Sequence, residues 1–180
     1  VTIAGLNIRH VAAARGGAID NTGALILDGV TINDSQAISG GAVYNSGSLQ
    51  ILNSTIVANG ASSGGVIHNA PGATTSIRHA TVADNSGILL QNDAGSGAAQ
   101  VAATILSAPA AGQCVGAIAA GSGNVVHNNS CLAGALSDDP LLGLLRDNGG
   151  PTFTRAIPAN SPAVDRAACT VSEDQRGRVR

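Results

Sequence analysis

Aromatic residues are almost missing from this 180-residue sequence. Tyr44 and Phe153 are its only tyrosine and phenylalanine, and tryptophan and methionine are absent. Proteins that bind sugars or nucleic-acid bases commonly stack them on aromatic rings. Two rings in the whole chain exclude this commonest kind of glycan-binding site.

Charge is scarce as well. Only 11% of the residues are charged, against about 25% in an average soluble domain. Lysine is absent, the nine basic residues are all arginine, and the formal net charge is −2. Without a basic stripe to neutralise phosphates, nucleic acid is excluded as a partner. A hydrophobic content of 44% with so little net charge also argues against disorder and for a packed chain.

Long hydrophobic runs are the third absence. No apolar stretch approaches the roughly 20 residues that cross a bilayer, so no membrane span is expected in this chain. The sequence has 24 glycines, and each glycine inside a helix costs about 1 kcal/mol relative to alanine. A helical bundle is therefore excluded.

What the sequence does have is an internal repeat. Gly-Gly-Ala-Ile-Asp-Asn at 16–21 returns at 40–45, at 64–69 and more loosely at 87–92, so its asparagines are spaced by 24, 24 and 23 residues. A second phrase at 27–32 returns at 51–56 and 77–82, and in a copy read as one residue shorter at 101–105. Repeats of this length are typical of solenoids.

Within each unit, apolar and polar residues alternate over short runs, which indicates strands, and no helical stripe is present. Glycine, asparagine, serine and aspartate separate these runs, as expected of turns. A unit of about 24 residues cannot bury its inner face alone, so successive copies must stack. The sequence predicts an all-β parallel β-helix of about five coils over residues 1–132. A leucine-rich repeat is the competing architecture, but the fixed Leu-x-Leu phrase that it requires is absent.

Stacking makes each alignment column a ladder with a spacing of about 4.8 Å. We expect the repeated asparagines to form a structural ladder in which side-chain amides bond to one another. Two columns are expected to point inward and one column of threonines outward. The members are Asn21, Asn45, Asn69 and Asn92 for the ladder; Ile19, Val43, Ile67 and Leu90, and Ile8, Ile32, Ile56, Val82 and Ile105 for the inward columns; and Thr31, Thr55, Thr81 and Thr104 for the threonines.

From about Ala133 the repeat is lost and proline becomes frequent. Solenoids need an atypical unit to cover their ends, so residues 133–180 are expected to form an irregular C-terminal cap on the last coil.

Four phrases in this terminal segment carry a family resemblance. They are Asp139-Pro140-Leu141-Leu142-Gly143, Asp147-Asn148-Gly149-Gly150-Pro151-Thr152, Ser161-Pro162-Ala163-Val164-Asp165 and Asp174-Gln175-Arg176-Gly177. In this order after the glycine-rich coils, they resemble the choice-of-anchor Q family of bacterial surface proteins, and the coils also resemble the repeats of polymorphic outer-membrane proteins. The resemblance implies a right-handed parallel β-helix in a secreted or surface-displayed bacterial protein, and no established catalytic residues.

Three cysteines are present. Cys114 and Cys131 flank one degenerate coil and resemble the paired cysteines of that family, which implies a disulfide. Such a bond would contribute roughly 3 kcal/mol, and an exported compartment would permit it. Zinc is the rival interpretation, but three thiols without close spacing make a poor site. For Cys169 a free thiol, burial under the cap and a bond to another chain all stay open.

One outward column is the best candidate for chemistry. Asp20, Tyr44, His68 and Gln91 place an acid, a phenol, an imidazole and an amide in succession on one surface patch. Asp20 and His68 would lie two coils apart, about 9–10 Å, which is too far to share a proton directly. Solvated strand positions are the simpler interpretation, so we assign no catalytic residue, metal or cofactor.

The expected function is that of a noncatalytic, extracellular structural or adhesive domain. Two alternatives stay open: a fibre or matrix subunit that stacks end to end through uncapped coils, because Val1 falls inside a repeat, and a polysaccharide-active lyase or hydrolase of pectin-lyase-like architecture. The expected partners are further copies of the chain or a cell-surface glycan or protein.

Overall fold

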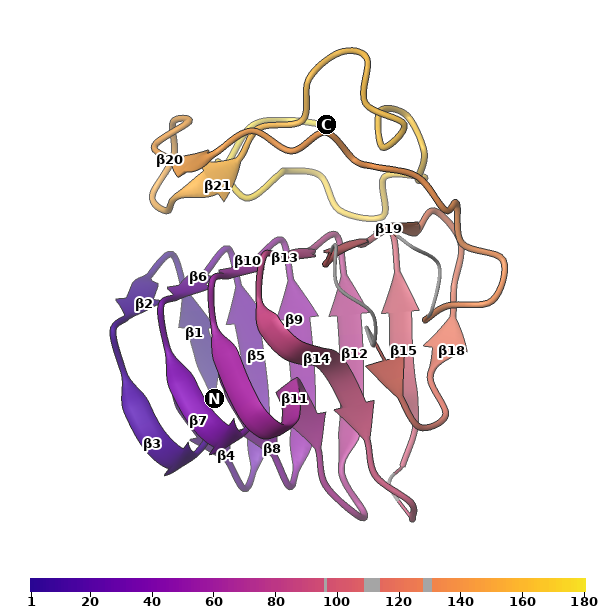
Figure 1. Ribbon diagram of the computed structural model, residues 1–180. Coiled ribbons are helices and arrows are strands. Elements are labelled where there is room, and N and C mark those ends of the chain that lie inside the picture. Colours follow the sequence, from indigo (N-terminus) through magenta and orange to yellow (C-terminus); the bar gives the residue numbers. More distant parts are fainter. Residues whose placement is uncertain (96, 109–113, 128–130) are drawn as a thin grey trace.

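The computed structural model describes residues 1–95, 97–108, 114–127 and 131–180. In these residues the chain forms strands and turns without any helix, and parallel strands stack into a solenoid of about five turns (Figure 1). The prediction of an all-β parallel β-helix is confirmed. The described residues accordingly contain no helix that is long and apolar enough to cross a membrane.

The strands of successive coils form three parallel sheets. Sheet A contains β1 (Thr2–Ala4), β5 (Ala24–Asp28), β9 (Ser48–Leu52), β12 (Thr74–Arg78), β15 (Ala99–Ala102) and β18 (Ala119–Ala120). Sheet B contains β2 (Asn7–Arg9), β6 (Thr31–Asn33), β10 (Thr55–Val57), β13 (Thr81–Ala83), β16 (Ile105–Ser107) and β19 (Val125–His127). Sheet C contains β3 (Ala12–Arg15), β7 (Gln36–Ser39), β11 (Gly60–Asn69), β14 (Ser86–Asn92) and β17 (Cys114–Val115), with β4 (Ile19–Asn21) and β8 (Val43–Asn45) paired beside them.

The inner columns follow the sequence repeat, with one correction. In sheet C the register aligns Ile19, Val43, Ile67 and Leu90 as expected. In sheet B, however, Val82 is paired with Leu106 and not with Ile105. The last copy of this phrase is therefore full-length and runs from Val101 to Leu106, because the preceding strand pairs Ile77 with Val101.

The same shift corrects the threonine column. Thr31, Thr55 and Thr81 are in register, but their next neighbour is Ile105. Thr104 belongs to a different, inner corner, where its hydroxyl donates to the carbonyl of Ala102 at 2.8 Å. Because Thr104 is fully buried, it offers no surface for a ligand.

Two corners of the solenoid depend on left-handed backbone. At the corner between sheets A and B, one residue per coil has a φ of 46–62°; the members are Gly5, Gly29, Asn53, His79 and Ala103. At the corner between sheets B and C, the members are His10, Asp34, Ala58 and Asp84, with a φ of 52–58°. Glycine, asparagine and aspartate tolerate this conformation best, which explains why turn-forming residues recur in the sequence at the coil period.

The asparagines form a continuous ladder of side-chain amides. Nδ2 of Asn21 donates to Oδ1 of Asn45 at 2.7 Å, Asn45 donates to Asn69 at 2.7 Å, and Asn69 donates to Asn92 at 2.6 Å. All four are buried. Each ladder step joins two neighbouring coils, so the four asparagines connect four coils along the axis.

A second polar ladder went unnoticed in the sequence. Oδ1 of Asn59 accepts a hydrogen bond from the Ser35 amide at 3.0 Å, and Oδ1 of Asn85 accepts one from the Asn59 amide at 2.8 Å. The 24- and 26-residue separations of these pairs are the signal that could have revealed it. This ladder supports the corner between sheets B and C.

The C-terminal segment begins on the last coil, where Leu136 pairs with Val125, but most of it does not form a cap there. It runs back along the outer face of sheet B, with the short antiparallel pair β20 (Leu145–Arg146) and β21 (Thr154–Arg155) at its far end (Figure 1). The Phe153 amide reaches Oδ1 of Asn7 in the first coil at 3.1 Å, and the Thr31 hydroxyl donates to the Phe153 carbonyl. The outward polar groups of sheet B explain this position, because they pair with the backbone of the segment.

The cysteines divide as one bonded pair and one free thiol. Cys114 and Cys131 are joined by a disulfide with a sequence separation of 17. Cys169 is exposed and has no disulfide partner within the chain, which rules out burial under the C-terminal segment and leaves a free thiol and a bond to another chain open.

Candidate functional site

The predicted surface column lies on sheet C, and its four members are in register. Asp20 pairs with Tyr44, Tyr44 with His68, and His68 with Gln91. The rings of Tyr44 and His68 pack against each other with their centroids 4.9 Å apart. The column therefore forms one contiguous cluster, with Tyr44 between Asp20 and His68.

Arg15, which sequence reasoning did not include, completes the exposed end of this cluster. Its Nε donates to Oδ2 of Asp20 at 2.9 Å, and its guanidinium carbon lies 4.6 Å from the centroid of the Tyr44 ring. The hydrogen bond to Asp20 raises the pKa of Arg15 above its ordinary value. A permanent cation is thus held over the aromatic ring.

His68 departs from the expectation of a solvated strand position. It is only 7% exposed, because Tyr44 packs on its ring and its two nitrogens contact neighbouring side chains. A buried imidazole whose two nitrogens each contact a specific side chain differs from a solvated residue on the outer face of a strand.

The partners of His68 are Ser39 and Asp93, both missed in the sequence. The Ser39 hydroxyl is hydrogen-bonded to Nδ1 of His68, and Oδ2 of Asp93 lies 2.8 Å from Nε2. Ser39 ends β7, His68 lies in β11, and Asp93 follows β14, so three successive coils each supply one side chain. A serine, a histidine and an aspartate are thereby connected in series.

The protons in this series can be assigned from the carboxylate end. Burial opposes the ionisation of Asp93, but hydrogen bonds from Gln91 and His68 outweigh it, and the pKa of Asp93 lies below its ordinary value. An ionised carboxylate only accepts hydrogen bonds, so Nε2 of His68 carries the proton. When the ring is neutral, Nδ1 is an acceptor and the Ser39 hydroxyl is its donor.

Gly64 makes room for this contact. A Cβ at this position would lie 2.5 Å from the Ser39 hydroxyl oxygen and 2.6 Å from Nδ1 of His68. Any other residue would push the two side chains apart, so the glycine is a requirement of the Ser39–His68 pair.

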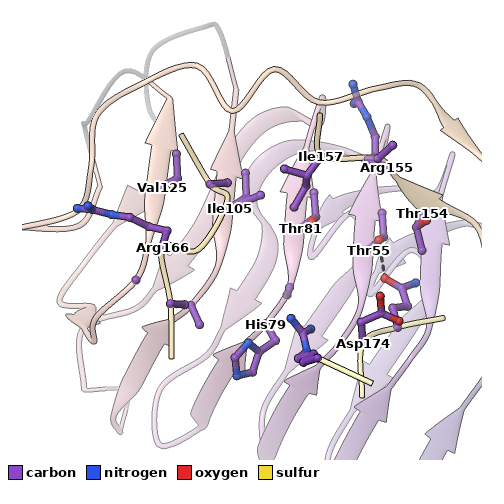
Figure 2. A pocket seen from close by; sticks show the side chains of 18 of the residues that line it. Thr55, His79, Thr81, Ile105, Val125, Thr154, Arg155, Ile157, Arg166 and Asp174 are labelled. Carbon is purple, nitrogen blue, oxygen red and sulfur yellow. Dashed lines mark hydrogen bonds between the residues drawn. The ribbon is translucent and has the colours of Figure 1, made fainter. Parts of the chain in front are cut away.

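A separate hollow lies between sheet B and the C-terminal segment. It encloses about 540 Å³, and its walls include Thr55, His79 and Asp174 (Figure 2). Arg155 and Arg166 line it but extend away from its middle (Figure 2).

The polar groups around this hollow are occupied with one another. The Thr55 hydroxyl donates to Oε1 of Gln175 at 2.7 Å, and Arg176 pairs with Asp174 at 2.6 Å. Arg155 forms an ion pair with Asp84. The Thr55–Gln175 and Arg155–Asp84 contacts hold the C-terminal segment on the solenoid, which makes the hollow a seam between two parts of the fold.

His79 is the titratable corner of this seam. Its Nε2 lies 2.6 Å from the Thr170 hydroxyl. Burial, followed by the charges of Arg180 and Arg78, lowers the pKa of His79 below its ordinary value. The neutral imidazole is therefore the form that fits the seam.

The described residues hold no cluster of side chains suited to binding a metal ion. In residues 1–95, 97–108, 114–127 and 131–180, no cluster of three or more histidine, cysteine, aspartate or glutamate side chains could hold an ion.

Comparisons of the chain with models of protein families, with curated proteins and with solved structures found no match. Inference about function consequently depends on the geometry of this chain.

Proposed function

We propose that this chain is a rigid structural or adhesive domain of a secreted or surface-displayed bacterial protein. The observation that carries the proposal is the continuity of its ladders along the axis. The buried Asn21–Asn92 ladder crosses four coils without a gap in its hydrogen bonds. Because each coil is bonded to the next through backbone, amides and apolar columns, the coils resist separation along the axis.

The C-terminal segment adds a brace along one side. It contacts the first coil through Phe153 and Asn7, the third coil through Gln175 and Thr55, and the fourth through Arg155 and Asp84. A bond on one side of a solenoid that crosses several coils limits bending toward the other side. This resistance to bending supports a role in which the domain carries mechanical force.

An exported location is supported by the disulfide and by the family resemblance of the terminal phrases. Disulfides persist in oxidising compartments and are rare in the cytosol. In protein taken from its native cells, we expect the mass of the Cys114–Cys131 peptide pair to show an intact bond and the chain to be found in the surface or secreted fraction. A cytosolic fraction with reduced Cys114 and Cys131 would contradict the proposal.

Mechanical strength is the direct test of the structural role. The full chain, tethered at both termini between marker domains, should extend only at high force and as one cooperative event. Asn45→Ala should lower that force, whereas the exposed Asn160→Ala should not. Extension of the unmodified chain coil by coil at low force would refute a load-bearing role.

A further inference from the structure

The Ser39–His68–Asp93 series is not something that the coil requires. The positions equivalent to His68 in neighbouring coils are Asp20, Tyr44 and Gln91, and those coils stack in the same register without an imidazole. Continuity between coils is already supplied by the adjacent asparagine ladder. An imidazole placed between a hydroxyl and a carboxylate therefore calls for a chemical explanation.

We propose that Ser39 is an activated nucleophile that cleaves short acyl esters, with His68 as its general base and Asp93 as the group that orients His68. The series supplies what nucleophilic catalysis needs: a hydroxyl bonded to an imidazole nitrogen and a second hydrogen bond that fixes the ring. The activity is additional to the structural role and does not depend on it.

The step balances with water as the only co-reactant. The Ser39 oxygen bonds to the carbonyl carbon of the ester while its proton passes to Nδ1 of His68. The ester C–O bond then breaks, and the departing alcohol takes this proton. Water attacks the acyl-serine, its proton moves to His68 and then to the Ser39 oxygen, and the carboxylic acid leaves.

The strand next to Ser39 carries a cation. Arg15 is the register partner of Ser39 in the neighbouring strand, and parallel neighbours are about 4.8 Å apart. Its guanidinium is held by Asp20 and Tyr44. A fixed positive charge of this kind stabilises an oxyanion better than a mobile one, since it needs no reorganisation during the reaction.

The substrate class follows from the surface next to Ser39. Ile38, the preceding residue of β7, lines a hollow of about 430 Å³. Its walls also include Ala37, Ala61, Gln36, Ser62 and Ser86. Ser39 itself is half-buried. A shallow hollow that combines alanine and isoleucine with serine and glutamine suits a short acyl chain, such as acetyl or butyryl, better than a long one.

The decisive experiment needs no variant. The full-length protein is treated with a fluorophosphonate, which reacts with activated serines, and the adducts are mapped by peptide mass spectrometry. The exposed Ser63 serves as reference within the same molecule. We expect Ser39 to react at least about 100-fold faster than Ser63, the lower range of general-base catalysis. Equal rates at the two serines would overturn the proposal.

Variants then separate an activated serine from a merely accessible one. His68→Gln should remove most of the rate advantage of Ser39, and Asp93→Asn should reduce it while the far-UV circular dichroism stays unchanged. Release of p-nitrophenol from p-nitrophenyl acetate should disappear in Ser39→Ala and persist in Ser63→Ala. If Ser39→Ala released p-nitrophenol at the rate of the unmodified protein, the assignment of Ser39 as nucleophile would be wrong.

Discussion

Replacing Asn45 by alanine tests the ladder on which the stacked coils depend. Asn45 is completely buried. Its Nδ2 donates to Oδ1 of Asn69 at 2.7 Å and to the Thr74 carbonyl at 2.9 Å. Its Oδ1 accepts from Asn21 at 2.7 Å and from the Gly47 amide at 3.1 Å. Alanine removes these four hydrogen bonds at once, together with two longer ones from Nδ2 to the Gly47 carbonyl at 3.3 Å and to the Thr75 hydroxyl at 3.2 Å.

The four losses do not weigh equally. Asn21 keeps a bond to the Gly23 carbonyl at 3.0 Å, and Oδ1 of Asn69 keeps one from Thr75 at 2.8 Å. The Gly47 amide and the Thr74 carbonyl lose a buried partner, and such a loss costs about 1–3 kcal/mol for each group. We therefore expect Asn45→Ala to lower the free energy of unfolding by about 3–4 kcal/mol.

Equilibrium unfolding in urea, followed by far-UV circular dichroism, measures this difference. Asn160→Ala is the matched control, because Asn160 is exposed in a turn and such changes stay within about 0.5 kcal/mol. Asn45→Asp separates hydrogen bonding from volume: it keeps the acceptor but places a second oxygen where Nδ2 faced Asn69, so it should destabilise as much as alanine.

The reasoning fails if Asn45→Ala costs less than about 1 kcal/mol, the net value of one ordinary hydrogen bond. It also fails if Asn45→Asp is as stable as the unmodified protein at neutral pH. Either result would mean that backbone stacking alone carries the coils.

Three further predictions concern the corners and the seam. Gly41→Ala places a Cβ 2.2 Å from a carbonyl oxygen of the next coil and should cost about 3 kcal/mol in urea unfolding, while Gly23→Ala, which has nothing within 4 Å, should leave the midpoint unchanged. Cys114→Ser combined with Cys131→Ser opens a loop with a sequence separation of 17 and should lower the free energy of unfolding by about 3 kcal/mol; reduction of the unmodified protein should match it. Because the pKa of His79 is lower in the folded state, the unfolded state binds the proton first as the pH falls below about 6.5, and stability drops. His79→Asn should flatten this drop in urea midpoints between pH 7.5 and 5.5; an equal drop in the variant would disprove the assignment.

Much of the coil architecture was predictable because the repeat states the register directly. Equal phrases 24 residues apart place Asn21 beside Asn45 without further assumptions. The prediction erred where the phrase degenerated: at 101–105 one alanine was read as missing, and the inward residue was taken to be Ile105 when it is Leu106. A column assignment is only as good as the flanking strand that anchors it.

The Ser39–His68–Asp93 series escaped prediction for a geometric reason. His68 is 29 residues from Ser39 and 25 from Asp93, so neither partner shares its column. The contacts run diagonally across a corner where the register shifts between Gly60 and Gly65. The course of the C-terminal segment beyond the last coil escaped prediction for another reason: it has no period, and its contacts join residues more than 100 positions apart.

Because the C-terminal segment lies along the side of the solenoid, its contacts fix the number of coils that it can span. The Phe153 amide is hydrogen-bonded to Asn7 in the first coil, while Arg155 forms an ion pair with Asp84 in the fourth. Duplicating or deleting one 24-residue unit between Asn7 and Asp84 would change their separation by one coil spacing, about 4.8 Å. The contacts with Phe153 and Arg155 could not then both be kept. Uncovered solenoids tolerate changes in unit number, but this one is committed to its length unless the segment changes with it.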